Sequence, residues 1–433
     1  MSMTILRGRI LSFVREPQGL DDKASYRYIE DGAIGIVDGK IVSVGNFDAA
    51  MVGGAAVIDH RPHLILPGFI DTHLHYVQSQ MIASYAGSLL EWLNTYTFVD
   101  EQKFSQQGHA EAVASAFYDE LIRHGTTTAV AYCSSAPASV DAYFAEAEKR
   151  NMLMIGGKVM MDRNAPEALC DTAQSSYDDS KALIARWHGR GRGLYAISPR
   201  FAITSTPAQL EAAQALVAEH ADCYVQTHLS ENDAEISLSM QLYPEAPDYT
   251  GIYEQYGLLG PRTLLGHCIH LNHRETGVLA ETSSVAVFCP TSNLFLGSGL
   301  FDHARLVQHG VRIGIATDIG GGTSFSMLRT LDEGYKVLQL RGERLTPFNS
   351  FYMMTLGNAR ALSLEGTIGT IAPGCAADLV VLDSSATPAM ALRMQTATQL
   401  VEELFLLQTL GDDRAIAEVY VAGARMKSTF DGL

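Results

Sequence analysis

Two histidines spaced i, i+2, His73 and His75, close a continuous apolar run at residues 64–75. Such a run is typical of a strand that is buried on both faces. Residues i and i+2 of a strand point to the same side, so the two imidazoles can bind one metal ion, with about 2.0–2.1 Å to each nitrogen if the metal is zinc. A single histidine would more often be a buried structural residue. The pair predicts metal ligands, and other segments must supply the rest of the ligand set.

Seven further strand-like runs follow, with helical segments between them. They cover residues 126–132, 152–161, 194–201, 223–229, 262–267, 284–289 and 311–318. Strands that alternate with helices indicate an α/β protein with a parallel sheet, and eight of them predict a (β/α)8 TIM barrel. The active sites of such barrels lie at the C-terminal ends of the strands. Those ends hold Arg200, His228, His267 and Asp318.

Three histidines and one carboxylate around an ion leave one coordination position for water. A divalent metal lowers the pKa of that water toward neutrality and so makes a hydroxide nucleophile. Asp318 can bind the metal and also accept the proton of the water. His267 can hold or orient the hydroxide from the other side.

Glu231 lies three residues after His228 and has two interpretations. In a dry pocket its carboxylic acid would have a raised pKa, suited to moving a proton to the substrate. Alternatively it belongs to a helix cap, because residues 230–233 (SEND) have the composition of a helix start. The spacing alone leaves both interpretations open.

Lys158 raises the question of a second metal, since a carboxylated lysine could bridge two ions. It lies within the predicted strand 152–161, away from the end of the next strand. A structural role is therefore favoured, and with it a single metal ion.

Both ends of the chain are rich in short strands. Residues 33–45 hold two alternating runs joined at Asp38-Gly39, which predicts a hairpin. Strand-like runs return at 376–383 and 417–423. We expect segments 1–64 and 372–433 to pair into a small β-sandwich, and segment 65–371 to form the barrel.

Composition limits the partners of the protein. The 433 residues are 47% hydrophobic and carry a formal net charge of −17, which argues against nucleic acid or an anionic membrane as a partner. The N-terminus lacks the pattern of a signal peptide, and no apolar stretch reaches the roughly 18 residues of a membrane span. The six cysteines are scattered, which predicts reduced thiols in a cytoplasmic protein.

Several motifs resemble a known family. Segments 67–75 (PGFIDTHLH) and 373–380 (PGCAADLV) resemble the amidohydrolase superfamily. Within it the chain is similar to the guanine deaminase family. The motifs of that similarity are LEWLNTYTF at 90–98, GKVMMDRN at 157–164, SPRF at 198–201, QTHLSEN at 226–232, TDIGGG at 317–322 and LGDDR at 410–414. The pieces LEWL, SPRF and LGDDR are far more specific than the others.

The resemblance implies a function and a set of site residues. The implied reaction is hydrolytic deamination of guanine to xanthine and ammonia by a zinc-activated hydroxide. One zinc ion per subunit is expected on His73, His75, His228 and Asp318. The implied catalytic residues are Glu231, Asp318 and His267, and the implied substrate contacts are Gln78, Arg200, Phe201, His228, Glu231 and Asp318. A homodimer is also implied.

The chemistry of guanine agrees with this assignment. Its O6 and N7 are adjacent acceptors that suit the fork of Arg200, and Phe201 can stack on the purine face. Three alternatives remain. A related one-metal aminohydrolase or chlorohydrolase could act on another purine or a triazine, a two-metal amidase or lactonase could share the barrel, and a barrel without activity could serve as a scaffold.

Overall fold

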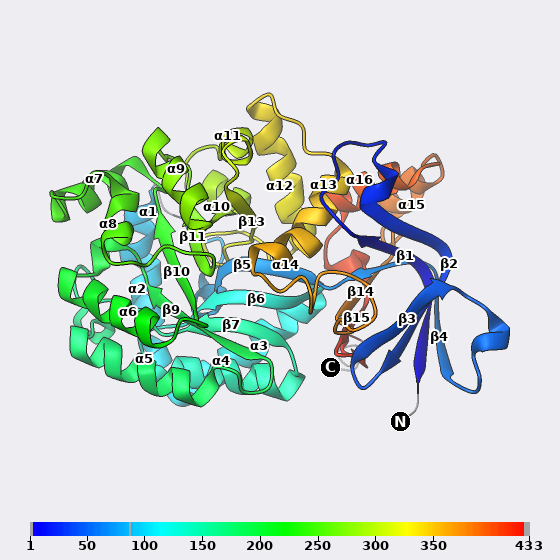
Figure 1. The fold of residues 1–433 in the computed structure, drawn as a ribbon, viewed down its shortest axis with the longest axis horizontal. Coiled ribbons are helices and arrows are strands. Elements are labelled where there is room, and N and C mark those ends of the chain that lie inside the picture. Colours follow the sequence, from blue (N-terminus) through cyan, green and yellow to red (C-terminus); the bar gives the residue numbers. More distant parts are fainter. Residues whose placement is uncertain (1–2, 86–87, 428–433) are drawn as a thin grey trace.

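The computed structural model describes residues 3–85 and 88–427, which form a parallel barrel and a mixed sheet beside it (Figure 1). Eight parallel strands follow one another around the barrel, as predicted. They are β5 (Phe69–His75), β6 (Thr126–Tyr132), β7 (Leu153–Gly157), β9 (Gly193–Pro199), β10 (Tyr224–Leu229), β11 (Thr263–His267), β12 (Val285–Phe288) and β13 (Arg312–Ile315). A short strand, β8 (Val159–Met160), also pairs with β9. The predicted strand 152–161 is therefore two shorter ones.

The barrel is nearly closed where its first and last strands meet. The Thr72 hydroxyl, on β5, donates to the carbonyl of Ile315 on β13 at 3.1 Å. The amide of Asp318, just beyond β13, donates to the carbonyl of His73 at 2.9 Å. These long-range bonds bring residues from the two ends of the barrel sequence to the same mouth.

Helices cover the outside of the barrel. The main ones are α3 (Gln107–Arg123), α4 (Pro137–Arg150), α5 (Ala173–Trp187), α6 (Pro207–Glu219), α7 (Asp233–Leu242), α8 (Tyr249–Gln255), α9 (His273–Thr282), α10 (Pro290–Phe295), α11 (His303–Gln308) and α12 (Met327–Leu340). Thr206 caps α6 by accepting from the amide of Gln209. Gly125 follows α3 with φ +83°, a left-handed conformation that favours glycine. None of the helices in the described ranges is long and apolar enough to cross a membrane.

The apolar run at residues 64–75 is not one strand, so that prediction is wrong. Its first part ends β4 (Ala56–Pro67), which pairs with β14 (Leu379–Leu382) outside the barrel. Its second part is β5, which pairs with β6. Gly68 lies at the change of partner, and a Cβ there would come within 2.2 Å of the Thr127 hydroxyl. The run is buried throughout because it lies in both sheets.

Both chain ends pair with each other, as predicted, and together they form one mixed sheet. Its order is β16-β15-β14-β4-β1-β2-β3. The strands not yet given are β1 (Thr4–Phe13), β2 (Tyr26–Val37), β3 (Lys40–Asn46), β15 (Ile416–Val421) and β16 (Ala424–Arg425). The turn at Asp38 and Gly39 has φ 49° and 75°, which confirms the hairpin between β2 and β3. Residues 428–433 of the predicted C-terminal segment lie outside the described ranges.

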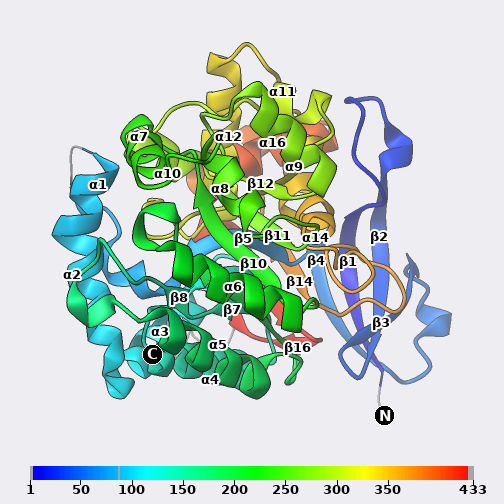
Figure 2. The ribbon, with the colours of Figure 1, turned by 60° about the vertical axis from the view of Figure 1, so that its left-hand side comes forward.

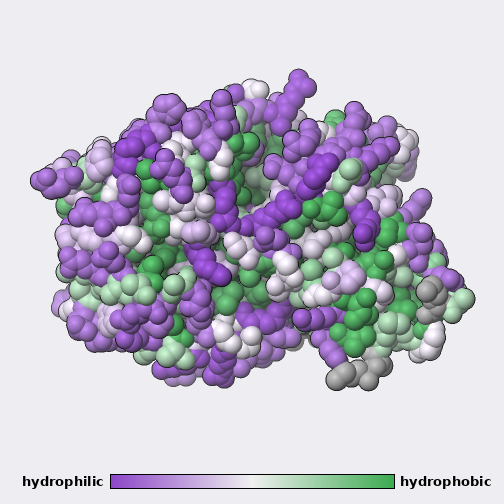
Figure 3. Space-filling model, in the orientation of Figure 1, coloured by the Kyte–Doolittle hydropathy of each residue, from purple (hydrophilic) through white to green (hydrophobic). Residues whose placement is uncertain are grey.

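Helices cover part of this terminal sheet. The helices there are α13 (Pro347–Tyr352), α15 (Pro388–Met394) and α16 (Leu400–Leu410), whereas α14 (Asn358–Ala361) packs against β5 and β13 of the barrel. Tyr26 on β2 stacks on Phe348 of α13 with ring centroids 4.6 Å apart, and Phe13 on β1 meets the edge of Tyr352. Other side chains of the same strands, among them Leu6, Ile65 and Leu379, pack into a separate buried cluster. Figure 3 shows apolar residues at the surface over this part of the molecule.

A helical segment connects β5 to α3 beside the barrel mouth. It contains α1 (Leu89–Trp92), a π-helical turn at Leu93–Thr97 and α2 (Phe98–Glu101). Figure 2 shows α1 and α2 at the same end of the barrel as α7 and α10, the helices that follow β10 and β12. This segment therefore lies next to the C-terminal ends of the strands.

Candidate metal centre and active site

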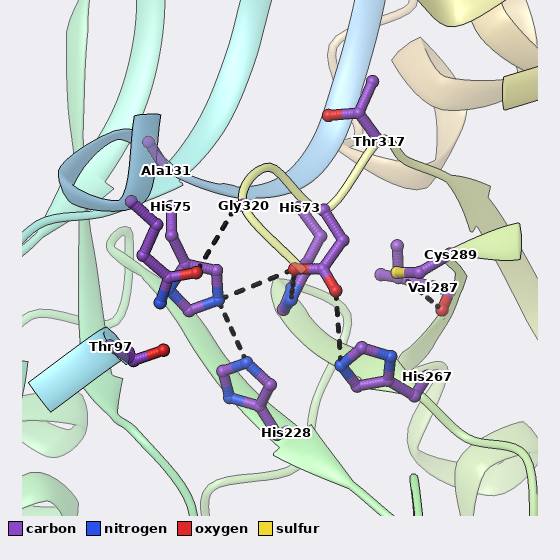
Figure 4. Close-up of polar contacts among 12 residues, drawn as sticks. His73, His75, Thr97, Ala131, His228, His267, Val287, Cys289, Thr317 and Gly320 are labelled. Atoms are coloured by element: carbon purple, nitrogen blue, oxygen red, sulfur yellow. Dashed lines mark hydrogen bonds and ion pairs between the residues drawn. The ribbon is translucent and has the colours of Figure 1, made fainter. Parts of the chain in front are cut away.

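The predicted metal ligands converge at the C-terminal end of the barrel (Figure 4). The Nε2 atom of His73 lies 3.4 Å from Oδ1 of Asp318, and that of His75 lies 3.7 Å from the same oxygen. The Nε2 atoms of His75 and His228 are 3.2 Å apart. Ligand atoms around a tetrahedral zinc ion, each about 2.0–2.1 Å from it, are separated by about 3.3 Å. The observed spacing thus suits one ion among these four side chains.

The protonation of the histidines also suits a cation. Nδ1 of His228 donates to the carbonyl oxygen of Arg200 at 2.7 Å, so its Nε2 lone pair faces His75. Burial lowers the pKa of His75 and of His228 well below the usual value, which keeps both rings neutral. Within the described part of the chain, His73 Nε2, which faces Asp318, is buried without a hydrogen-bond partner. Buried polar atoms are rarely left so, and the donor set fits a divalent metal.

The backbone at the mouth takes conformations that side chains rarely adopt. His267, the last residue of β11, has φ 72°, and Asp318, three residues beyond β13, has φ 53°. Left-handed conformations of non-glycine residues are strained and tend to occur at functional sites. Gly266 supplies space, because a Cβ there would come within 2.6 Å of the His73 ring. The left-handed residues and the space at Gly266 together let the His73 ring and the Asp318 carboxylate lie close to each other.

Glu231 faces the centre and does not cap a helix. Asn232 caps α7 and forms a capping box with Glu235, so the helix-start interpretation of Glu231 is wrong. Oε2 of Glu231 lies 3.3 Å from Nε2 of His267, and Oε1 accepts from the Ser298 hydroxyl at 2.8 Å. Burial, with the nearby charges of Glu235 and Asp318, raises the pKa of Glu231 well above its usual value. The carboxyl group is thus suited to hold a proton.

His267 lies between two carboxyl groups. Its Nε2 is 3.3 Å from Glu231 and 3.9 Å from Oδ2 of Asp318. The Asn293 amide donates to Nδ1 at 3.0 Å, which leaves the ring proton on Nε2. Burial lowers the pKa of His267 to about 3, so the ring is neutral. A neutral imidazole placed in this way donates a hydrogen bond toward the centre.

The predicted substrate contacts line a cavity above the metal ligands. Gln78, Arg200 and Phe201 lie in its wall with His228, Glu231, His267 and Asp318. Leu89, Trp92 and Leu93, from the segment after β5, add apolar surface, as does Leu296. The indole Nε1 of Trp92 is buried with no hydrogen-bond partner in the described residues. A flat, polar-edged ligand suits a cavity of this composition.

Lys158 does not join the cluster. It is fully buried between β7 and β8, and its ammonium forms an ion pair with Asp171. This is the structural role that the sequence favours, and it leaves no lysine among the ligands described above.

Three residues that orient the site residues were not predicted from the sequence. Glu101 is fully buried and binds Arg200 and Gln78, Asn293 holds His267, and Ser298 holds Glu231. Asn293 lies four residues after Cys289, at the end of a predicted strand, so the rule of strand ends could have pointed to its neighbourhood. No comparable signal marks Glu101 or Ser298, because neither lies at a strand end.

Comparison with known proteins gives a consistent result. A family profile described as "Amidohydrolase family" matches residues 64–426. Guanine deaminase of Escherichia coli K12 is 47% identical over 426 residues, which are 98% of this chain and 97% of that protein. A solved structure of E. coli guanine deaminase has a TM-score of 0.95 at 46% identity, covering 98% of this chain and 99% of that one. A guanine deaminase from C. acetobutylicum, solved with guanine in its active site, has a TM-score of 0.87 at 28% identity, covering 98% and 100%.

Proposed function

Because the chain belongs to the amidohydrolase family and, within it, to the guanine deaminases, we propose that it hydrolyses guanine to xanthine and ammonia. The observation that carries this proposal is the convergence of three histidines and Asp318 below a cavity walled by Arg200 and Phe201. The E. coli relative at 47% identity and its solved structure support the same substrate.

We assign the metal centre to His73, His75, His228 and Asp318, and we propose one zinc ion per chain. The facing Nε2 atoms and the neutral rings support this set. A divalent cation held there would activate water as a nucleophile near neutral pH. The ion pair of Lys158 with Asp171 supports one metal over two.

The chain's own residues then carry the protons. The Asp318 carboxylate accepts a proton from the water that attacks C2 of guanine. Glu231, whose pKa is raised by burial, donates a proton to a ring nitrogen and so lets the C2 carbon become tetrahedral. The Nε2–H of neutral His267 stabilises negative charge beside that carbon. Asp318 then passes its proton to the amino group, the C2–N bond breaks to release ammonia, and Glu231 takes back the proton of the new C2 hydroxyl, which leaves xanthine.

The cavity wall recognises the base. Arg200 can donate to the adjacent O6 and N7 acceptors of guanine, and Phe201 can contact its face. Gln78 has less freedom than its sequence suggests, because its Oε1 accepts from the Gly320 amide at 3.3 Å. Its Nε2 donates to Glu101 at 2.9 Å, so the second N–H of that amide is the group left to donate to the substrate.

The decisive experiment measures xanthine formation from guanine by the purified protein, with metal content determined on the same sample. We expect turnover, one equivalent of zinc per chain, and much weaker hydrolysis of adenine, 8-oxoguanine and chlorotriazines. Metal-loaded protein that hydrolyses a triazine but not guanine would instead support the related aminohydrolases. Two equivalents of metal would support a two-metal enzyme.

We also propose that the protein is a cytoplasmic homodimer. All six cysteines are free in the structure and five are buried, which fits a reducing compartment. Sedimentation equilibrium at micromolar concentration would test the dimer, and a monomeric mass would contradict it.

A further inference from the structure

We propose that Glu101 is a positioning residue for substrate recognition, and that it fixes Arg200 and Gln78 in the orientation that selects a purine with an oxygen at C6. This inference rests on the proposed function, because it concerns the same cavity. Glu101 itself is not among the residues that line the cavity. It acts through its two partners.

Glu101 has a carboxylate committed to these two side chains. Nη1 of Arg200 donates to Oε1 at 3.0 Å and to Oε2 at 2.7 Å. Nε2 of Gln78 donates to Oε1 at 2.9 Å. Glu101 is fully buried and Arg200 is 2% exposed, so water competes little for these bonds. A buried carboxylate without such partners would be costly, which makes the arrangement rigid.

The same short helix also holds the face of the guanidinium. Phe98 lies on α2, three residues before Glu101, and packs against Arg200. The Cζ atom of Arg200 is 5.3 Å from the centroid of the Phe98 ring. One helix therefore supplies both an aromatic face and a charged edge. The guanidinium plane has little freedom to rotate between them.

The contacts of Glu101 decide which donors remain for a ligand. Nη1 of Arg200 is occupied, while no acceptor in the described residues bonds its Nε or Nη2. These two nitrogens share one edge of the guanidinium and form the fork that matches two adjacent acceptors. O6 and N7 of guanine are such a pair. Without Glu101, Nη1 would also be free, and the choice of edge would be lost.

Gln78 is oriented by the same carboxylate. Its Nε2 faces Glu101 and its Oε1 faces the amide of Gly320, so the amide cannot flip without losing both bonds. Gly320 belongs to the loop that carries Asp318. Glu101 thus connects the recognition side of the cavity to the loop that holds a metal ligand.

The test compares KM, which reports substrate recognition, with kcat, which reports the chemical step, in the variant Glu101→Gln. This substitution keeps the shape of the side chain and removes its charge. We expect KM for guanine to rise about 10- to 100-fold, as when a charged hydrogen-bond partner is removed, with kcat reduced less than fivefold. Zinc content should be unchanged. Glu101→Asp, which keeps the charge on a shorter side chain, should give an intermediate KM. It also provides the measurement if the glutamine variant does not fold.

A pair of competitive inhibitors sharpens the test. Hypoxanthine has O6, whereas purine lacks it, and neither carries the amino group that is hydrolysed. The ratio of their inhibition constants measures recognition of the C6 oxygen, and it should fall toward 1 in Glu101→Gln. A merely structural defect would weaken both inhibitors and leave the ratio unchanged.

The matched control is Glu403→Gln. Glu403 is also buried and also binds an arginine, Arg9, but it lies in the terminal sheet region away from the cavity. It should leave KM and the inhibitor ratio unchanged. Wild-type protein that makes no xanthine would overturn the proposed function. An active wild type whose Glu101→Gln variant keeps KM and the inhibitor ratio, or loses only kcat, would overturn the role of Glu101.

Discussion

The barrel mouth and the terminal sheet bury polar side chains in opposite ways. In the terminal sheet His60 Nε2 and the Tyr420 hydroxyl pair at 2.7 Å, and Glu403 accepts from Arg9 and Ser384. At the mouth, His73 Nε2 and His75 Nδ1 are buried without a protein hydrogen bond in the described residues.

Backbone geometry separates the two regions in the same way. His267 and Asp318 at the mouth have left-handed φ values, although neither is glycine. The left-handed residues of the terminal sheet, Asp38, Gly39, Ala422 and Gly423, all lie in tight turns between neighbouring strands, whereas His267 and Asp318 stand at or beyond strand ends. Paired polar groups, with left-handed residues confined to hairpin turns, indicate a part built for stability. Buried polar atoms without hydrogen-bond partners, on a backbone in strained conformations, indicate a part built for binding and catalysis.

Among the variants that test this contrast, His73→Ala should have the largest effect. It removes an imidazole whose Nε2 faces Asp318, so the metal should be lost and turnover should fall by about 10⁴-fold or more, as when one member of a catalytic unit is removed. Elemental analysis and xanthine production measure both effects. His60→Ala, which removes a histidine from the terminal sheet, should keep metal and activity. Full zinc occupancy in His73→Ala would exclude His73 as a ligand.

Glu231→Gln should have the next largest effect. The amide cannot donate and accept a proton as the carboxyl group does, so kcat should fall about 10²- to 10⁴-fold while zinc content stays constant. Glu275→Gln is the matched control, because Glu275 is buried in the capping box of α9 and not in the cavity. It should lower the melting temperature and leave kcat unchanged. Undiminished turnover in Glu231→Gln would remove that residue from the reaction.

Gly266→Ala should have a smaller effect on the same centre. The added methyl group would lie 2.6 Å from the His73 ring and displace it, so metal affinity should fall about 10- to 100-fold. Zinc titration against a competing chelator measures the change. Gly277→Ala in α9 adds the same methyl group where no atom lies within 4 Å, and it should not alter metal affinity. Equal affinity in both variants would mean that the space at residue 266 is not needed.

The smallest functional effect is expected in the terminal sheet. Tyr420→Phe removes the hydroxyl that pairs with His60 and leaves a buried nitrogen unpaired. The free energy of unfolding should fall by about 1–3 kcal/mol, with kcat and KM unchanged. Denaturant unfolding measures the change in stability, and a guanine deaminase assay on the same variant measures kcat and KM. A large loss of kcat at wild-type stability would show that the terminal sheet contributes to the chemistry.

Sequence reasoning was most successful where local pattern determines structure. The eight barrel strands and the Asp38-Gly39 hairpin follow from periodicity and turn chemistry. It failed at residues 64–75, where one apolar run serves two sheets. An apolar run reports burial but not which strand is its partner, so the change at Gly68 has no local signature.

The sequence by itself determined which residues could meet at the barrel mouth, because parallel strands all deliver their C-terminal residues to one end. It did not determine how those residues are held. Glu101 comes from a helix beside the barrel, Ser298 and Asn293 come from the region after β12, and their hydrogen bonds orient Arg200, Glu231 and His267. Only the tertiary structure decides such contacts, because they join segments far apart in the chain through the packing of the whole fold.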